Sequence, residues 1–279
     1  MKKVLIFAAV IVAAALLVMM VGFRTPQARK ETAQQSVLLL VEDDTGAYFM
    51  QLRQGIRKAL SERNCSLTTE LALQSGRLST EWQGREYSGA LVFIEDEAVR
   101  RSALDAMAEN RIPTVTIDSW DGLHSTVCQD ETAQARLLAG AVGSAERVYV
   151  CGGGETLRQS ARIALGERFA EEGAPSAGEN CAVAALDPEA AQRLIEEKSA
   201  GLWDAPLVAV APVELSAAWL ESGLVQALVI PSPYAAGYIA ASRALWSEDA
   251  SEWKSPAFIV RPEDLYDAQN VKLVFPLLN

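Results

Sequence analysis

The hydrophobic pattern of residues 36–63 predicts a buried strand, a polar turn and an amphipathic helix. The stretch from Ser36 to Val41 is an apolar run, as in parallel strands that are covered on both faces. Glu42 to Thr45 then supplies turn residues. The apolar side chains that follow recur at spacings of three and four and share one helix face: Phe49, Leu52, Ile56 and Leu60. The turn therefore lies between a strand's carboxyl end and a helix's amino end, where open α/β sheets bind ligands.

The same alternation of strand and helix runs along the rest of the chain. Further short apolar runs predict strands at 66–73, 89–94, 112–117, around 127, 147–151, 180–186, 207–211, 227–230 and 256–260. Most of the segments between them have a helical pattern. Strands that alternate with helices pair in parallel and connect by right-handed crossovers. This order therefore predicts an α/β protein with parallel sheets.

The first thirty residues differ from the rest. Lys2 and Lys3 precede an uncharged run from Val4 to Phe23, which is long enough to cross a bilayer core as a helix. Neither a small-residue cleavage site nor a cysteine follows the run. We therefore expect residues 1–30 to be a signal anchor with its flank. The chain would be a single-pass cell-membrane protein with an extracytoplasmic domain; the alternative is secretion after cleavage of a signal peptide.

The charge balance narrows the class of partner. Residues 1–30 carry five Lys or Arg and no Asp or Glu, so residues 31–279 hold 20 basic and 36 acidic side chains, a net charge of −16. Such a balance argues against nucleic acid and against anionic lipid as partners. With 279 residues, half of them hydrophobic, the chain is long enough to form two globular lobes.

Side chains for catalysis or metal binding are scarce. His124 is the only histidine, and the four cysteines are isolated, without the spacing of a zinc site. Gly152 to Gly154 follow a strand and precede a helix, but they lack phosphate-loop spacing, so a tight turn is the simpler interpretation. We expect a protein that is not an enzyme and that uses no metal and no cofactor.

Aromatic residues near the strand-to-helix turns are candidates for ligand contacts. Tyr48 and Phe49 open the first helix, Trp120 follows the fourth strand, and Tyr234 opens the helix after 227–230. An aromatic face is a platform for the apolar face of a sugar ring or for another planar ligand. Local core packing is the alternative, most of all for Phe49, which also lies on the apolar helix face.

The order of several motifs resembles that of a known family. The opening strand, turn and helix read VLLLVEDDTGAYFMQLRQGIRKAL, with Tyr48 and Phe49 at two aromatic positions. Next come YSGALVFIED, NRIPTVTIDS with Asp118, VCQDETAQARLLAG with Asp130, RVYVCGGG, SPYAAGYIAASRAL and PAFIVRPEDL. In this order and spacing, from about Val37 to Leu265, the chain resembles the type I periplasmic binding proteins. The resemblance is to their ribose-binding and lac-repressor-type sugar-binding group.

The resemblance implies two Rossmann-like lobes whose parallel sheets are joined by a hinge of three crossovers, here preceded by an N-terminal transmembrane helix. The crossovers would fall near 119–126, 226–232 and 247–256. The implied domains are 36–118 plus about 232–261 for one lobe, about 124–230 for the other, and 262–279 as a C-terminal extension.

The departures from the family lie mainly in the second lobe's half of the implied site. The family's A-x-N-D-x-x-A segment, whose asparagine binds sugar hydroxyls, is identified with AVAPVELSAA, where Pro212 and Val213 replace Asn-Asp. The family's V-x-G-F-D strand is expected to be missing. Ser119 replaces one usual arginine, and Arg158 or Arg162 would replace another. Losing partners for buried hydroxyls should weaken sugar binding, so the fold carries over better than the ligand.

These patterns favour an extracytoplasmic solute-binding domain for a sugar or a similar small polar molecule. It would serve an ABC-type importer, with a membrane permease or a sensor as its partner. The residues expected to line the ligand cleft are Tyr48, Phe49, Asp118, Trp120 and Tyr234, with Asp44 and Asp130 as further candidates. The alternative is a degenerate sensor or protein-interaction module that has kept the fold and lost the small-molecule site.

Overall fold

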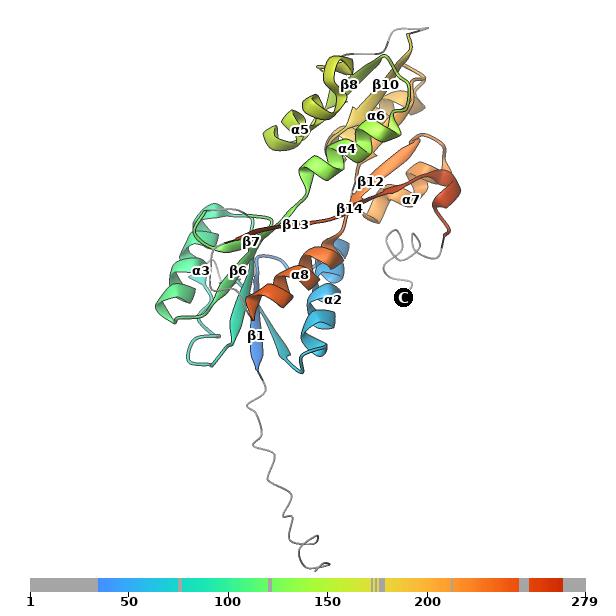
Figure 1. The fold of residues 1–279 in the computed structure, drawn as a ribbon. Coiled ribbons are helices and arrows are strands. Elements are labelled where there is room, and N and C mark those ends of the chain that lie inside the picture. The colour runs from blue at the N-terminus through green and yellow to red at the C-terminus, as the bar shows by residue number, and fades with distance from the viewer. Residues whose placement is uncertain are drawn as a thin grey trace, which may run out of the picture. The chain divides into compact units, whose positions relative to one another are not determined.

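The computed structural model describes residues 35–74, 77–119, 122–171, 173, 175, 179–211, 213–245 and 251–267, without the side chains of residues 47 and 213–216. Strands and helices alternate along the chain (Figure 1). The strands are β1 (Ser36–Val41), β2 (Ser66–Leu71), β3 (Leu73–Gln74), β4 (Arg77–Leu78), β5 (Gly89–Phe93), β6 (Thr114–Ile117), β7 (Ser125–Gln129), β8 (Arg147–Cys151), β9 (Phe169–Ala170), β10 (Cys181–Ala185), β11 (Leu207–Val210), β12 (Ala227–Pro231), β13 (Glu252–Ser255) and β14 (Ala257–Val260). The helices are α2 (Ala47–Ser61), α3 (Glu97–Glu109), α4 (Glu131–Ala141), α5 (Glu155–Leu165), α6 (Pro188–Ser199), α7 (Val213–Glu221) and α8 (Pro233–Ala244), with short 3-10 turns η1 (Gly166–Arg168) and η2 (Pro262–Asp264).

Most of these strands belong to two sheets of six strands each. The first sheet has the order β13-β7-β6-β5-β1-β2, and all of its neighbours are parallel. The second has the order β14-β12-β11-β10-β8-β9, and only β14 is antiparallel to its neighbour. We call the first sheet with α2, α3 and α8 the first lobe, and the second sheet with α4 to α7 the second lobe. The predicted α/β fold with parallel sheets is confirmed.

Side-chain alternation along β1 places a helical layer on each face of the first sheet. Val37, Leu39 and Val41 face a core that α2 and α8 close. Leu38 and Leu40 face another core, which α3 closes. All five side chains are fully buried. Burial on both faces explains why the sequence of this strand is an unbroken apolar run rather than an alternating one.

The second lobe repeats this three-layer arrangement. Leu138 of α4 and Leu157 of α5 belong to the core on one face of the second sheet. Leu194 of α6 and Trp219 of α7 belong to the core on the other face. Each lobe therefore has its own pair of hydrophobic cores, as expected for helices that cover both faces of a parallel sheet.

Within the described residues, the chain passes between the lobes three times. The crossings are at residues 129–130, between β7 and α4, at 231–233, between β12 and α8, and at 255–257, between β13 and β14. We refer to these three segments as the crossings. Each lies at an end of a strand, so a change of backbone direction there leaves both sheets intact.

The structure corrects two of the predicted domain boundaries. The turn-rich stretch after Asp118 predicts a boundary before β7, but β7 belongs to the first sheet, and residues 118–124 only connect it to its parallel neighbour β6. The sequence also places the strand at 256–260 in the first lobe, whereas β14 pairs antiparallel with β12 of the second. A turn marks the end of a strand, but local sequence does not say which sheet the next strand joins.

Helices α2 and α8 approach so closely that their backbones touch. A Cβ atom on Gly55 would lie 1.9 Å from the carbonyl oxygen of Tyr234, and one on Gly237 would lie 2.1 Å from that of Leu52. Both distances are far inside van der Waals contact, so this approach requires glycine. Although α8 follows the second sheet in the chain, the contact fixes it to the first lobe beside α2 (Figure 1).

The predicted membrane anchor at residues 4–23 lies outside the described residues. Among the residues that the structure does describe, no helix is both long and apolar enough to cross a bilayer. The predicted C-terminal extension at 262–279 is described as far as Asp267, and its Leu265 is buried in a core of the second lobe.

Gly237→Ala should lower the free energy of unfolding by about 1–3 kcal/mol, because the added methyl group overpacks the contact with Leu52. The matched control is Gly140→Ala on the exposed side of α4, where an added Cβ meets no atom within 4 Å. The control should instead gain up to about 1 kcal/mol from the higher helix propensity of alanine. Urea denaturation of the full-length chain measures both, and equal effects would contradict the close approach.

Candidate functional site

A cavity of about 340 Å³ lies at the carboxyl ends of strands from both sheets. Small-molecule sites typically measure about 300–1,000 Å³. The first lobe and the crossings contribute Tyr48, Gln129, Pro231 and Pro233 to the lining, and the second lobe contributes Glu131, Gln134, Gly153, Gly154, Leu157, Leu186, Asp187, Pro188, Val210 and Ala211. Both lobes therefore form this cavity, at the sheet edge where open α/β folds bind ligands.

The polar side of the cavity is a series of hydrogen bonds that converges on Asp118. The Tyr48 hydroxyl donates to the Asp118 carboxylate, and both the side chain and the backbone N–H of Gln129 donate to it as well. The Gln134 amide donates to the Gln129 side-chain oxygen over 3.0 Å. Because Asp118 belongs to the first lobe and Gln134 to the second, these hydrogen bonds span the crossing at 129–130.

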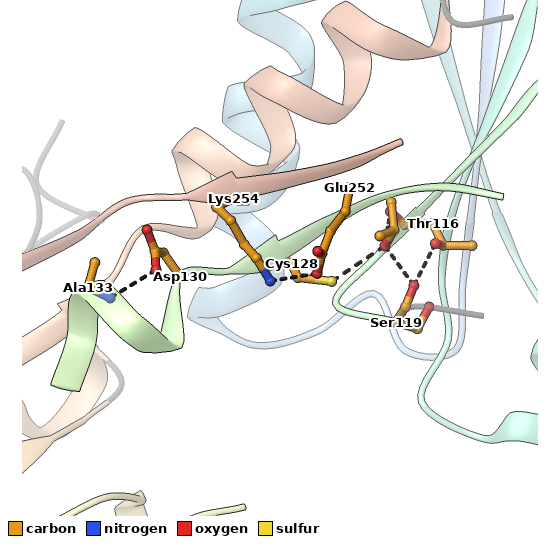
Figure 2. A network of polar contacts seen from close by, with 8 residues as sticks. Thr116, Ser119, Cys128, Asp130, Ala133, Glu252 and Lys254 are labelled. Atoms are coloured by element: carbon orange, nitrogen blue, oxygen red, sulfur yellow. Dashed lines mark hydrogen bonds and ion pairs between the residues drawn. The ribbon is translucent and has the colours of Figure 1, made fainter. Parts of the chain in front are cut away.

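Asp118 follows β6 in a backbone conformation that few residues adopt, with φ at 57°. Asp and Asn tolerate this left-handed region better than most residues do. The next carbonyl oxygen, that of Ser119, accepts hydrogen bonds from the hydroxyls of Thr116 (2.7 Å) and Thr126 (2.6 Å). Figure 2 shows Thr116 and Ser119 joined at the end of the sheet. The connection between β6 and β7 is thus tied to its own strands, which holds the Asp118 carboxylate in place.

The surroundings of Tyr48 and Asp118 shift the pKa values of both side chains. Burial, and then the Asp118 charge, raises the pKa of the Tyr48 hydroxyl well above its usual range, so it remains a donor. Crowding by protein atoms raises the pKa of the Asp118 carboxyl, although the residue as a whole stays accessible to water. Hydrogen bonds from Tyr48 and Gln129 oppose that rise, and the Glu95 charge adds to it. The Tyr48 ring also stacks on Phe93, with 5.6 Å between ring centroids.

Backbone hydrogen bonds join the crossings to one another. The Asp130 carboxylate caps α4 (Figure 2), and the Ser232 hydroxyl caps α8. The backbone N–H of Asp130 donates to the Ser255 carbonyl over 3.1 Å, and that of Ser232 donates to the Pro256 carbonyl over 3.1 Å. The first two crossings are therefore each bonded to the third, beside the cavity.

On the second-lobe side, Asp187 ties two strand-to-helix turns together. Its carboxylate accepts from the backbone N–H of Gly153 and from that of Ala190, each over 2.6 Å. A Cβ on Gly152 would lie 2.3 Å from this carboxylate, and Gly152 has φ at 71°, so glycine is needed there. Helix α5 begins after Gly154 without a capping side chain. The amide hydrogens of its first turn therefore remain for solvent or a ligand oxygen.

The remaining lining of the second lobe is largely apolar. Leu157, Leu186, Val210 and Ala211 form this side. Glu131 is the exception: it lies in the first turn of α4, and burial raises the pKa of its carboxyl. The cavity thus has a hydrogen-bonding side and an apolar side, which suits a ring with polar edges and an apolar face.

Of the predicted site residues, Tyr48 lines the cavity, and its hydroxyl donates a hydrogen bond to the Asp118 carboxylate. Two others on the first lobe lie elsewhere. Phe49 is 2% exposed and belongs to the core under α2, as its place on the apolar helix face requires. Asp44 lies at a separate surface cavity with Arg53 and neighbouring residues of β2. Contrary to the expectation from the sequence, Phe49 and Asp44 do not line this cavity.

Three further predictions concern residues near the crossings. The Asp130 carboxylate is used as the cap of α4 and does not line the cavity. Tyr234 is exposed and lies near Lys58 on α2, whereas the preceding Pro233 lines the cavity. Successive residues of a helix point in directions about 100° apart, so Tyr234 can face solvent although its neighbour Pro233 lines the cavity. Trp120 lies outside the described residues.

Four polar residues of the lining are not among the predicted site residues: Gln129, Glu131, Gln134 and Asp187. A signal for Asp187 exists, because residues 185–191 read A-L-D-P-E-A-A, with the spacing of A-x-N-D-x-x-A and Asp187 at the asparagine position. Assigning that motif to AVAPVELSAA places it one strand-and-helix unit too late. With the motif at β10 and α6, no strand of the second lobe is missing, in agreement with its six-stranded sheet.

Neither arginine proposed to replace a family residue lines the cavity. Arg158 and Arg162 both form ion pairs with Glu171, and Arg158 also donates to the Gly152 carbonyl over 3.0 Å. Within the described residues, no group of three His, Cys, Asp or Glu side chains could hold a metal ion. None of the four cysteines forms a disulfide in the described part of the chain. What the lining provides is hydrogen bonding and apolar contact for an organic ligand.

No family model and no curated protein matches the chain. Solved structures do match it. The arabinose-binding protein AraP from Geobacillus stearothermophilus has a TM-score of 0.70 at 10% identity and covers 83% of this chain and 98% of its own. An ABC transporter solute-binding protein from Agrobacterium vitis, bound with α-D-tagatopyranose, has a TM-score of 0.64 at 12% identity, with 86% and 99% covered. The XylFII–LytSN complex has a TM-score of 0.58 at 16% identity, and the match covers 83% of this chain and 99% of the other.

The fold is that of the type I periplasmic binding proteins. The type I fold agrees with the resemblance read from the motifs. Because 98–99% of these chains is covered, it also agrees with a second lobe that lacks no strand-and-helix unit. These neighbours are named as binding proteins rather than enzymes.

Asp118→Asn should stabilise the protein at neutral pH. The pKa of Asp118 is raised in the folded state, so the native protein holds this proton more tightly than the unfolded chain does. Folding therefore becomes less favourable as the pH rises from about 3.9 through the raised value. Asparagine removes that cost and also tolerates the positive φ.

Thermal unfolding of the full-length chain across a pH series checks this. The Tm of Asp118→Asn should exceed that of the wild type at neutral pH, and the difference should shrink as the pH falls below about 3.9, where the wild-type carboxyl is neutral in both states. The matched control is Asp105→Asn on an exposed position of α3, which should show no such dependence. A variant less stable than the wild type at neutral pH would contradict the assignment.

Proposed function

We propose that this protein is a binding domain that captures a small polar solute, such as a sugar, between its two lobes. The observation that carries the proposal is the cavity of about 340 Å³ with lining residues from both lobes. A ligand that contacts both lobes favours the arrangement that holds them together, because a ligand shifts an equilibrium toward the state it binds better. The three crossings are the segments that would bend.

The lining supports a ligand with hydroxyl groups on one side and carbon–hydrogen bonds on the other. Tyr48, Gln129 and Gln134 provide directional hydrogen bonds, and the uncapped first turn of α5 provides further donors. Leu157 and Leu186 would contact the apolar face of a ring. A sugar ring meets both requirements at this size.

The names of the structural neighbours support the same class of ligand. AraP is named as an arabinose-binding protein, and the Agrobacterium vitis protein carries α-D-tagatopyranose. The latter is also named as a solute-binding protein of an ABC transporter. By analogy with these proteins, we propose that this protein presents a sugar to an ABC-type importer or reports its presence to a sensor.

The same proposal places the binding domain outside the cytoplasmic membrane, held by the anchor expected at residues 4–23. Residues 24–35 would link the anchor to Ser36 at the amino end of β1. A fully extended linker of this length reaches about 40 Å. The cavity lies at the carboxyl ends of the parallel strands, whereas Ser36 is at the amino end of β1.

A second candidate is a protein-interaction module that has lost its small-molecule site. The apolar second-lobe lining at Leu157, Leu186 and Val210 favours it, because fewer groups remain there to pair with hydroxyls. One structural neighbour is a complex of two named components, XylFII and LytSN. The two candidates differ in whether the cavity takes a small molecule.

Calorimetric titration and thermal unfolding of the full-length chain against pentoses and hexoses test the proposal. A solute at a hundred times its Kd should add about 2.7 kcal/mol to the unfolding free energy. Tyr48→Ala should weaken binding roughly tenfold or more, because it removes a partner of a buried hydrogen-bond network. Tyr234→Ala is the matched control, since that ring is exposed and does not line the cavity.

Two outcomes would contradict parts of this proposal. If no pentose or hexose binds or shifts the unfolding temperature, the protein-interaction module becomes the better account. If Tyr234→Ala abolishes binding and Tyr48→Ala does not, the solute binds somewhere other than in this cavity.

A further inference from the structure

The cavity carries negative charge without a cation in its lining. Glu131 and Asp187 line it, and Asp118 is hydrogen-bonded to two other lining residues, whereas no Lys or Arg is among the described lining.

The two carboxylates of the lining have different surroundings. Asp187 accepts from two backbone amides, those of Gly153 and Ala190, and is fully used in holding the second lobe together. Glu131 accepts no hydrogen bond and forms no ion pair with any described residue, although it is half-buried. Burial raises the pKa of the Glu131 carboxyl, and the Lys254 charge offsets that rise only in part, so the negative charge of Glu131 is incompletely compensated.

The cations nearest to this region are already paired. Lys254 forms an ion pair with Glu252 at 2.6 Å (Figure 2) and attracts Glu131 only through the longer-range interaction of their charges. Arg158 is held by the Gly152 carbonyl and by Glu171. A positive charge for Glu131 would therefore come from outside this set of residues.

The Asp118 carboxylate, on the other side of the crossing at 129–130, also has no cation paired with it among the described residues. It receives hydrogen bonds from Tyr48 and Gln129, which are neutral donors, and the nearby charge of Glu95 repels it. Neutral donors stabilise a carboxylate less than a charged partner does. Glu131 thus lines the cavity from the second lobe, and the Asp118 carboxylate of the first lobe is hydrogen-bonded to the lining residues Tyr48 and Gln129.

We propose that the solute bound in this cavity carries a protonated amine, which Glu131 of the second lobe binds and which the charge of Asp118, on the first lobe, attracts through the lining residues Tyr48 and Gln129. The ligand class is an amino sugar, or a hydroxylated amine of similar size. This inference rests on the proposed function and narrows it. An ammonium group has three donors and a full charge, so it can donate to Glu131 and to the neutral acceptors of the lining while the Asp118 charge also favours it.

The rest of the lining agrees with an amine attached to a ring. Leu157, Leu186 and Val210 leave the far side of the cavity apolar, which suits the carbon face of the same ring. A carboxylate or phosphate ligand would instead meet two carboxylates and no cation, a combination that electrostatic repulsion disfavours. The lining therefore selects by charge as well as by shape.

Calorimetric titration of the full-length chain with matched probes tests this. The probes are D-glucosamine, D-galactosamine and D-mannosamine, each beside its parent hexose and its N-acetyl derivative, at mildly acidic pH where the amines are protonated. At least one amine should bind roughly tenfold or more tightly than its two neutral counterparts. That advantage should decrease as salt is added.

Variants locate the effect. Glu131→Gln and Asp118→Asn should each bring the amine to within about threefold of its parent sugar, because each removes one full charge and keeps the shape of the side chain. Glu109→Gln on an exposed position of α3 is the matched control and should keep the full preference. Thermal unfolding establishes that each variant is folded, and the salt dependence of the wild type provides a test that needs no variant.

The outcomes separate the inference from the proposed function. Amine and parent sugar binding equally would overturn the inference and leave the proposed function standing. An amine preference that survives both Glu131→Gln and Asp118→Asn, or that does not respond to salt, would overturn it as well. Binding of none of these probes would contradict the proposed function and the inference together.

Discussion

The contact between the backbones of α2 and α8 is the constraint on which the ligand site depends. Gly55 and Gly237 allow the two helices to touch, and Gly89 lets α8 approach β5 in the same way, where a Cβ would lie 2.5 Å from the Ala244 carbonyl. Tyr48 opens α2, and the crossing at 231–233 opens α8. The aromatic wall of the cavity and one of the segments that join the lobes are therefore placed by a single helix pair. Glycine lowers intrinsic helix propensity by about 1 kcal/mol, so its presence at such positions is a cost that the close packing outweighs.

The carboxylates around the cavity fall into two groups, according to whether they accept hydrogen bonds from backbone amides at the start of a helix. Asp130 and Asp187 each accept from amides at the start of a helix, where the helix dipole also favours a negative charge. These two carboxylates hold the turns in place. Glu131 has no such partner, and Asp118 relies on neutral donors. Fixed carboxylates shape the site, while the less compensated ones remain available to a ligand.

Sequence reasoning succeeded where the determining interactions are local or periodic. The apolar run of β1 and the alternation of strands with helices require only burial on two faces and short connections, and the structure has both. Lobe membership of β7 and β14 depends on pairing between distant strands, which no local pattern encodes. Among the site residues, Tyr48 and Phe49 differ by one helical position, and only the packing of α2 decides which of them reaches the core. Asp187 carried a usable motif, but the same spacing of small residues recurred one unit later.

The hydrogen bonds between the crossings have a mechanical consequence. Asp130 donates to the Ser255 carbonyl and Ser232 donates to that of Pro256, so neither of the first two segments can bend without displacing the third. Prolines at 231, 233 and 256 fix further torsion angles in the same region. Any relative movement of the lobes would therefore involve all three segments together, and one distance measured across the cavity would report on all of them.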